Sequence, residues 1–189
     1  QQIKQLAPSA EALAALEKPS AVVRNTTGQT PLILACAKNE LDKVKTLIAE
    51  GAEVNAKDFN GLSSLMFACS AGNLEVVVFI LKHKADIAAK NVQGYTSMAL
   101  AATAGRVEIV KKLIDAGASL DFKIKGVTLL MMVASKGRTD VIKLLISHGA
   151  DPTQKNYGGK TAFDFATAGG HAETARTLMT LTKPAEKEV

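Results

Sequence analysis

Tryptophan is absent from this sequence of 189 residues, and aromatic residues account for only 4% of it. Small apolar residues are abundant instead, so a core would have to come from the close approach of short elements. This composition suits a stack of short helices better than a β-sandwich or a barrel. The length is enough for one domain or one short array with a buried core.

Long apolar segments are also missing. No run of 18 or more apolar residues occurs, which argues against a membrane-spanning helix, and the chain does not open with the apolar run of a signal peptide. It begins Gln1-Gln2 without methionine. Either an export signal has been removed from a longer precursor or the sequence was trimmed. We favour removal, which places the protein in the periplasm or otherwise outside the cytoplasm, with a cytoplasmic location as the alternative.

The residues that usually carry chemistry are few. The three histidines, His83, His148 and His171, are dispersed, and no Cys, His and Asp group has the spacing of metal ligands. Phosphate-binding glycine loops and nucleophile elbows are absent too. We therefore expect no catalytic residue, no metal, no cofactor and no enzyme activity. The net charge of +5 is spread along the chain, so neither nucleic acid nor a membrane is expected as a partner.

The only cysteines, Cys36 and Cys69, lie 33 residues apart. Equivalent points on stacked helices are roughly 10 Å apart, beyond the reach of about 7 Å that a disulfide allows. We therefore expect two small buried thiols, which say little about the redox compartment.

The 33-residue spacing runs through most of the chain. Glycines recur at intervals of 33, 33, 32 and 33 residues, and a threonine or serine follows each of them by two positions. These glycines are Gly28, Gly61, Gly94, Gly126 and Gly159. A period of this length indicates an array of repeated units. The units are 25–57, 58–90, 91–123, 124–155 and 156–181.

Each unit predicts two helices and an extended connection. The threonine or serine caps a short apolar helix, as Thr30 does before PLILACA, with Pro31 at the first helical position. Glycine or asparagine ends this helix, and a second follows with apolar residues at helical spacing, as in Leu74-Val77-Leu81. The chain then runs extended through a short finger into the next unit. We predict a gently curved all-α solenoid of paired antiparallel helices with extended fingers.

The two ends of the chain differ from the units. Residues 1–24 contain a helix-forming run, EALAALEK, and resemble a half repeat whose helix covers the exposed end of the stack. The last second helix is more polar, as a terminal cap requires. Residues 182–189 are predicted to form a charged tail.

The motifs G-x-T-P-L-x-x-A, G-x-L-E-V-V and G-A-D-x-N within 33-residue units make the sequence similar to the ankyrin-repeat family. Gly28–Leu32, Gly72–Val77 and Gly149–Asp151 carry them most faithfully. The resemblance covers residues 25 to about 181. It implies the ankyrin fold and a role in binding other proteins.

The sequence departs from the family pattern in three ways. The histidine usual after P-L is missing throughout, so we expect packing to replace the hydrogen bonds that it makes in the family. In its place stand Ile33, Met66, Ala99, Met131 and Asp164. Lys84 replaces the glycine that ends a second helix, which predicts strain in that turn. The chain is also one residue short between Asp121 and Gly126, which predicts a tighter finger.

The resemblance implies that the fingers and the outer side of the first helices line a concave face. Apolar residues there have no packing role, which indicates a binding surface for another protein. They form a predicted exposed ladder: Phe59, Leu62, Val92, Tyr95, Ile124, Val127 and Tyr157. The alternative is that these side chains pack finger against finger.

Lysines form a second ladder beside the first, at the joints between units and at nearby positions. They are Lys38, Lys57, Lys90, Lys123, Lys125, Lys136, Lys155 and Lys160. Such cations would steer an acidic partner surface toward the apolar ladder. The alternative is a solvated edge that keeps the protein soluble.

We therefore expect a protein that binds another protein across units two to four and is a monomer when free. In one hypothesis it covers the active site of an enzyme with an acidic surface, as an inhibitor or self-protection protein. The sequence resembles small exported bacterial ankyrin proteins, some of which guard the cell against its own wall-degrading peptidases, and this resemblance implies such a peptidase as the partner. In the other hypothesis it is an intracellular scaffold or adaptor that joins two proteins and leaves both active.

Overall fold

The computed structural model of the chain describes residues 23–182. The capping helix expected in residues 1–24 and the charged tail expected at 182–189 fall almost entirely outside this range. Within it, five pairs of helices follow one another, with two short strands between the third and fourth pairs. The prediction of an all-α repeat solenoid is confirmed.

The first helix of each pair, called here the inner helix, is short. The inner helices are α2 (Pro31–Ala37), α4 (Ser64–Ala71), α6 (Ser97–Thr103), α8 (Leu129–Ala134) and α10 (Ala162–Ala168). Before α2, the Thr30 hydroxyl accepts a hydrogen bond of 3.3 Å from the Ile33 backbone N–H, and equivalent bonds precede α4, α6 and α8. The capping side chain defines where each helix starts, because it satisfies an N–H group that has no partner within the helix.

The second helix of each pair, the outer helix, follows after a short turn. The outer helices are α3 (Leu41–Ala49), α5 (Leu74–Lys82), α7 (Val107–Asp115), α9 (Thr139–Ser147) and α11 (Ala172–Thr182). The turn holds a residue of positive φ, which is glycine in four units and Asn39, with φ 60°, in the first. Lys84 adopts φ 63° after α5, where three other units have glycine. The strain predicted at Lys84 is therefore present.

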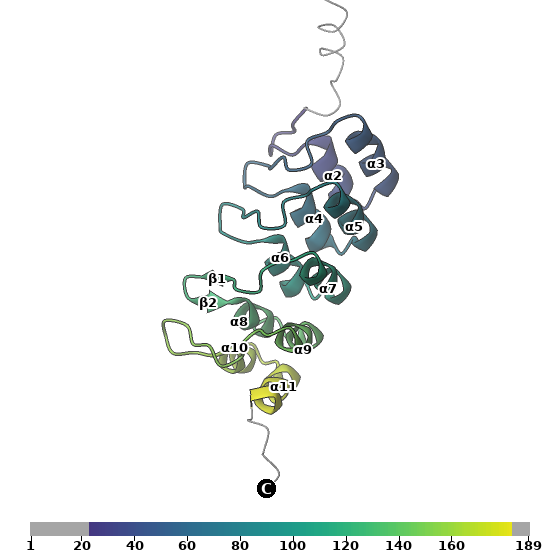
Figure 1. Cartoon of the computed structure of the whole chain (residues 1–189). Helices are drawn as coiled ribbons and strands as arrows, with labels where there is room; N and C mark the ends of the chain where they lie inside the picture. The colour runs from purple at the N-terminus through teal and green to yellow at the C-terminus, as the bar shows by residue number, and fades with distance from the viewer. Residues whose placement is uncertain (1–22, 183–189) are drawn as a thin grey trace, which may run out of the picture.

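The helices form two layers. Consecutive inner helices contact one another along the stack, and so do consecutive outer helices. Figure 1 shows the connections between units projecting as fingers on the side of the inner helices that faces away from the outer helices. The inner helices therefore lie between the fingers and the outer layer. Within residues 23–182, no helix has the length and apolar character needed to cross a lipid bilayer.

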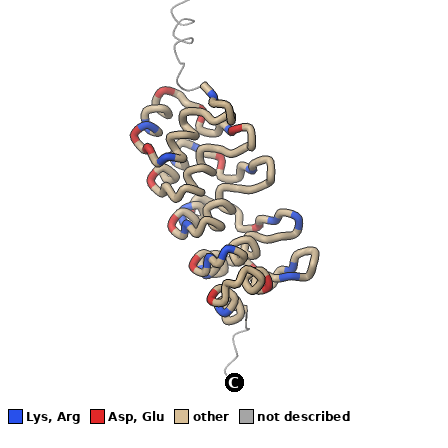
Figure 2. The backbone as a smooth tube through the Cα atoms, turned by 180° about the vertical axis from the view of Figure 1, so that it is seen from behind, with Lys and Arg blue, Asp and Glu red and all other residues tan. Residues whose placement is uncertain are grey.

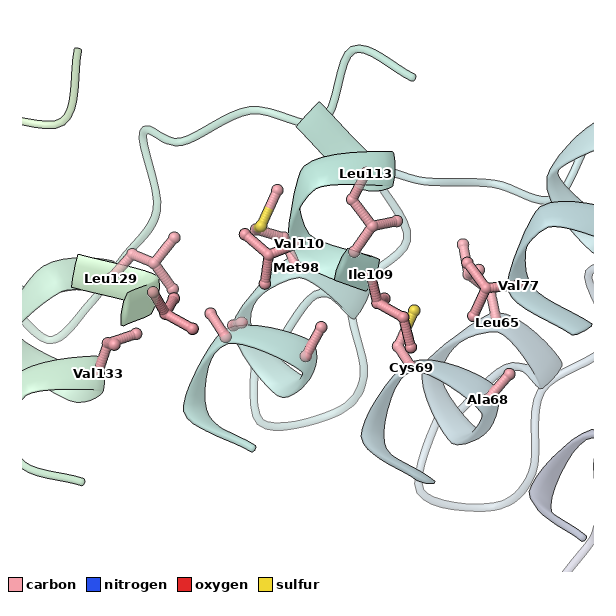
Figure 3. Close-up of a cluster of buried hydrophobic side chains, with 14 of the residues drawn as sticks. Leu65, Ala68, Cys69, Val77, Met98, Ile109, Val110, Leu113, Leu129 and Val133 are labelled. Carbon is pink, nitrogen blue, oxygen red and sulfur yellow. The ribbon is translucent and has the colours of Figure 1, made fainter. Parts of the chain in front are cut away.

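The core lies where the two layers meet. Ala68 and Cys69 from α4, Met98 from α6, and Val110 and Leu113 from α7 are buried in one continuous cluster (Figure 3). The residue five positions after the capping threonine or serine is alanine in four of the five units, and it is 0% exposed in each of them. Side chains this small let the inner helices approach closely, which explains how the chain forms a core with few aromatic residues.

Cys36 and Cys69 are free, buried thiols, as predicted. Burial raises the pKa of the Cys36 thiol from 9.0 to about 12, although the nearby Ser64 side chain partly opposes this shift. Burial also raises the pKa of the Cys69 thiol. The equivalent residue in unit three is Ala102, which is 0% exposed too. The two thiols therefore occupy positions that accept a small apolar side chain.

The expectation that packing alone replaces the missing histidine is wrong in the last unit. The Asp164 carboxylate accepts a hydrogen bond of 2.7 Å from the Thr161 backbone N–H and one of 3.0 Å from the Thr161 hydroxyl. These bonds lower the pKa of Asp164, the backbone bond more than the hydroxyl. In unit four, the Thr128 N–H lies 3.4 Å from the Met131 sulfur. Both side chains reach back to the capping residue, as in a capping box.

Candidate protein-binding surface

Four of the five fingers are organised by one side chain each: Asn25, Asp58, Asn91 and Asn156. In the second unit, the Asp58 carboxylate accepts hydrogen bonds from the backbone N–H groups of Asn60, at 2.9 Å, and Leu62, at 2.8 Å. Such a side chain holds the turn because it replaces backbone partners that the turn cannot supply. Neighbouring fingers therefore present equivalent residues at equivalent places.

The finger of unit four is tighter, as predicted. Strands β1 (Lys123–Ile124) and β2 (Val127–Thr128) pair antiparallel. The turn between them consists of Lys125, with φ 49°, and Gly126, with φ 78°. Two successive residues of positive φ are typical of a two-residue type I′ hairpin turn. The finger of unit four is therefore one residue shorter at its tip than the other fingers. Its two strands still pair with each other.

Finger tips pack against the preceding finger. A Cβ atom on Gly28 would stand 2.6 Å from the Phe59 ring, and one on Gly126 would stand 3.0 Å from the Tyr157 ring. Each ring thus covers a glycine one unit earlier. Phe59 nevertheless remains 70% exposed and Tyr157 89% exposed. The finger-to-finger packing considered as the alternative exists, and it leaves most of both rings accessible to a partner.

The rest of the predicted apolar ladder is unevenly exposed. Val92 is 72% exposed. Four members are only partly exposed: Leu62, Tyr95, Ile124 and Val127. Free exposure was wrongly expected for them: Tyr95, Ile124 and Val127 pack against the core cluster, where the finger meets the helices. A role of these residues in partner binding stays a prediction.

Most of the lysine ladder lies on the fingers, whereas Lys38 and Lys136 lie at the ends of the inner helices α2 and α8. Its predicted partner-binding members are all exposed: Lys57, Lys90, Lys123, Lys125, Lys136 and Lys155. The Lys57 ammonium donates a hydrogen bond of 3.2 Å to the Lys90 carbonyl oxygen. Figure 2 shows basic residues on the fingers of units four and five, whereas the outer helices carry acidic and basic residues side by side. The fingers therefore form a cationic edge of the molecule.

Sequence reasoning missed an apolar stripe on the inner helices. It consists of the residues four positions after each capping threonine or serine: Leu34, Phe67, Leu100, Met132 and Phe165. All five are partly exposed, whereas their two sequence neighbours are buried in units one to four. The stripe therefore lies on the least buried face of each inner helix. The stripe could have been found in the sequence, because a large apolar residue recurs at this position in every unit.

The fingers together with this stripe are called here the inner surface. Two pockets lie at the bases of the fingers. One, of about 530 Å³, lies between the connections into units three and four, and Lys90, Met98, Phe122 and Lys123 are among its lining residues. The other, of about 320 Å³, lies one unit further along and shares Phe122 and Lys123. Both pockets offer apolar contact close to a cation, as a side chain of a partner protein would require.

Side chains just before the outer helices tie each unit to the preceding one. These side chains are Asn73, Arg106, Arg138 and His171. Arg106 Nε donates a hydrogen bond of 3.4 Å to the Ser70 carbonyl, and Arg138 Nε donates one of 3.2 Å to the Thr103 carbonyl. The acceptors lie in the last turn of an inner helix, where carbonyl groups lack partners within the helix. This series of bonds fixes the spacing of the inner helices and so of the stripe.

Groups suited to acid–base or metal chemistry are scattered. Within residues 23–182, no three His, Cys, Asp or Glu side chains gather closely enough to hold a metal ion. His83 Nδ1 donates to the Phe79 carbonyl at 2.9 Å, and His148 Nδ1 to the Leu144 carbonyl at 2.8 Å. What the inner surface offers is apolar area and positive charge for contact with another molecule.

Two protein-family models match the chain. The model of ankyrin repeats in three copies matches residues 51–125 and 98–188, and the model of a single ankyrin repeat matches residues 27–59. No curated protein matches it. The matched ranges include all five helix pairs. The chain belongs to the ankyrin-repeat family.

Proposed function

Ankyrin repeats are protein-interaction modules, and we propose that this chain binds another protein through its inner surface. The observation that carries the proposal is the apolar stripe, with one large, partly exposed side chain in each unit. Phe59, Val92 and Tyr157 add exposed apolar area on the fingers beside it. An aligned set of exposed apolar groups is typical of a surface that a partner covers.

The inner surface is held in one shape before a partner arrives. Backbone hydrogen bonds join neighbouring finger tips, from Phe59 N to the Thr27 carbonyl at 3.2 Å and from Val92 N to the Asn60 carbonyl at 3.0 Å. The bonds from Arg106 and Arg138 join the helices behind them. A surface that is already ordered loses little conformational entropy on binding, so more of the contact energy appears as affinity.

For the partner we propose an enzyme with an acidic surface, which this chain covers as an inhibitor or self-protection protein. The exposed finger lysines support an acidic surface on the partner. The resemblance to exported bacterial ankyrin proteins supports a cell-wall peptidase and a periplasmic location. A scaffold that leaves its partners active is the alternative, and the effect on the partner's activity distinguishes the two.

Affinity capture from the native cell, with envelope and cytosol kept separate, tests the binding surface. The full chain serves as bait, and mass spectrometry identifies what it retains. We expect a variant with Val92→Glu and Leu100→Glu to lose the partner. The matched control carries Ala49→Glu and Thr180→Glu, the same change of charge at exposed positions on outer helices. The control should retain the partner.

Circular dichroism shows whether each variant is folded. Should Leu100→Glu unfold the chain, Val92→Glu with Tyr157→Glu changes only exposed fingers and takes its place. A folded variant of either kind that captures the same partner as the unmodified chain contradicts the proposal.

The activity of the captured enzyme separates inhibitor from scaffold. Turnover is measured with increasing amounts of the full chain. An inhibitor lowers turnover toward zero as the binding sites fill, whereas a scaffold leaves it unchanged at saturation. The fraction that yields the partner, envelope or cytosol, tests the proposed location in the same experiment.

A further inference from the structure

The cations of the five fingers differ in what they bind. In the first two fingers, the cationic side chains donate hydrogen bonds to backbone carbonyl oxygens. Arg24 donates to the Gly28 carbonyl at 2.7 Å and to the Lys57 carbonyl at 2.6 Å, and Lys57 donates to the Lys90 carbonyl at 3.2 Å. These two side chains help to join adjacent fingers.

In the later fingers the lysines have no such contact. They are Lys90, Lys123, Lys125, Lys155 and Lys160, and all five are exposed. Within residues 23–182, none of them donates a hydrogen bond from its ammonium group or forms an ion pair, whereas four lysines of the outer helices pair with acids three residues away. Among the described residues, lysines without such a partner also occur elsewhere, as at Lys82 and Lys111 of the outer helices, but four of these five finger lysines belong to the fingers of units four and five.

Acidic groups near these two fingers lie closer to the helices than the lysines do (Figure 2). The Asp151 carboxylate accepts hydrogen bonds from the Thr153 hydroxyl, at 2.7 Å, and the Thr153 N–H, at 2.8 Å. Asp164 is bound in the same way by Thr161. These hydrogen bonds come from neutral groups and leave both carboxylates charged, and the charges of Lys155 and Lys160 also help to lower the pKa of Asp164. The four lysines of these two fingers outnumber the three nearby acids, Asp121, Asp151 and Asp164, so net positive charge remains there for an external anion.

Accessible apolar area is distributed the other way. Leu34, Phe67 and Leu100 of the stripe lie in units one to three, whereas Met132 and Phe165 of units four and five pack against the core cluster. Tyr157 is the exposed aromatic residue of the fifth finger, and its hydroxyl can donate a hydrogen bond to a carboxylate. Apart from Tyr157, the inner surface thus changes from mainly apolar at units one to three to mainly cationic at units four and five.

From this gradient we infer the orientation and composition of the bound partner. The partner presents one polypeptide segment, with apolar side chains against units one to three and a cluster of Asp or Glu residues against the fingers of units four and five. This inference rests on the proposed function. At about 10 Å per unit the inner surface spans about 40 Å, which corresponds to about twelve residues of extended chain.

Selection from a library of random peptides of about twelve residues, displayed on phage, tests the composition. The folded full chain is the target. We expect selected peptides to carry acidic residues at one end and large apolar residues at the other. Reversing the charge of four finger lysines should weaken binding of a selected peptide about tenfold or more at about 0.15 M salt, because attraction to the acidic end of the peptide becomes repulsion. The variant is Lys123→Glu, Lys125→Glu, Lys155→Glu and Lys160→Glu.

The outer helices provide a matched control with the same total change of charge at exposed positions. It is Lys45→Glu, Lys111→Glu, Lys143→Glu and Arg176→Glu. Affinity for the peptide should stay within about twofold of the unmodified chain at the same salt concentration, since the outer helices lie on the side of the stack away from the fingers and salt screens exposed charges over about 8 Å. Equal loss in both variants contradicts the inference. Displacement of the peptide by a single-stranded oligonucleotide at equal concentration contradicts it as well.

Crosslinking tests the orientation. The selected peptide carries a bromoacetyl group at its acidic end, and a single cysteine is placed at the fifth finger, Tyr157→Cys, or at the first, Thr26→Cys. Both variants are made with Cys36→Ala and Cys69→Ala, so that one thiol reacts. We expect faster crosslinking at Tyr157→Cys. Faster reaction at Thr26→Cys overturns the orientation.

The substitution Leu100→Glu separates this inference from the proposed function. Peptides that bind regardless of Leu100→Glu do not use the inner surface, and they count against the proposed function itself. Peptides whose binding depends on Leu100 but not on the four finger lysines leave the proposed function intact and overturn the inference alone.

Discussion

The Phe59 ring lies against Gly28, one unit earlier, so closely that a Cβ atom on Gly28 would stand 2.6 Å from it. Gly28 also has φ 82°, a conformation that disfavours residues with a Cβ atom. The exposed aromatic tip and the repeat glycine therefore act together. The glycine permits the turn, and because it has no Cβ atom the ring of the next finger can pack against it.

Replacing Gly28 by alanine should destabilise the protein through both effects. The control is Gly149→Ala, because Gly149 has φ 93° and a Cβ atom added to it would meet no other atom within 4 Å. We expect Gly149→Ala to lower the free energy of unfolding by about 1–2 kcal/mol, and Gly28→Ala by about 1 kcal/mol more. Urea denaturation measures both. Adding Phe59→Ala should remove the extra loss, and equal losses in the two single variants would contradict the contact.

Truncation of Arg138 should weaken the junction between units three and four. Its guanidinium donates a hydrogen bond of 3.2 Å to the Thr103 carbonyl. We expect Arg138→Ala to cost about 1 kcal/mol and to speed hydrogen exchange of amides in α6 and α8. Lys143→Ala, at an exposed position of α9 whose ion pair with Asp140 is 3.9 Å long, is the control. Uniform acceleration of exchange along the whole stack would argue against a local role.

Proline at position 97 should stabilise the protein. The buried Ser97 hydroxyl has no hydrogen-bond partner, and Ser97 opens α6 at the place where Pro31 opens α2. Thr96 before it has φ −101° and ψ 166°, which proline tolerates in its predecessor. We expect Ser97→Pro to raise the free energy of unfolding by about 0.4–1 kcal/mol. Ser97→Ala separates removal of the hydroxyl from the proline effect, and a lower melting temperature for the proline variant would refute the prediction.

The buried thiols predict a loss of stability at alkaline pH. In the folded chain burial raises the pKa of Cys36 from 9.0 to about 12, and it raises the pKa of Cys69 as well. Above pH 9 the unfolded chain releases these protons while the folded chain keeps them, so the free energy of unfolding falls as pH rises. The contribution is fully present below pH 9 and is lost between pH 9 and about 12 for Cys36.

A variant with Cys36→Ala and Cys69→Ala should show a shallower decline above pH 9, measured by urea denaturation at a series of pH values. Alanine already fills the equivalent site at Ala102. Identical pH profiles for the variant and the unmodified chain would exclude the thiols as the cause. As a second readout, neither thiol of the folded chain should react with a thiol reagent at pH 8 until urea unfolds the protein.

Local chemistry explains why the fold could be predicted. Thr30 and its counterparts start the inner helices, and glycines such as Gly72 end them, because capping and positive φ depend on a few neighbouring residues. The shorter finger at Lys125–Gly126 was predictable for the same reason, since one missing residue changes the turn. Asp164 was misjudged, although its spacing from Thr161 matches a capping box.

Which finger side chains are exposed to solvent was harder to predict from the sequence. Phe59 lies two residues before a repeat glycine and Tyr95 directly after one, and both look like free finger residues in the sequence. Phe59 is nevertheless 70% exposed, whereas Tyr95 packs against the core. Tyr95 has Phe122 of that cluster as a neighbour, with 6.3 Å between the two ring centroids. Burial is a sum over neighbours, and this neighbour is distant in the sequence.

The amino-acid sequence is sufficient to establish the repeat period, which comes from comparing units, and the helix boundaries, which come from residues within each unit. It also predicts the buried thiols, because Cys36 and Cys69 occupy equivalent positions of two units. The ring of Phe59 over Gly28, the bond from Arg138 to Thr103 and the unequal roles of the finger lysines join residues about one unit apart. These contacts depend on the offset between stacked units, which spacing in the sequence does not specify. Packing sets that offset, and it thereby places the apolar part of the inner surface at units one to three and the unpaired cations at the fingers of units four and five.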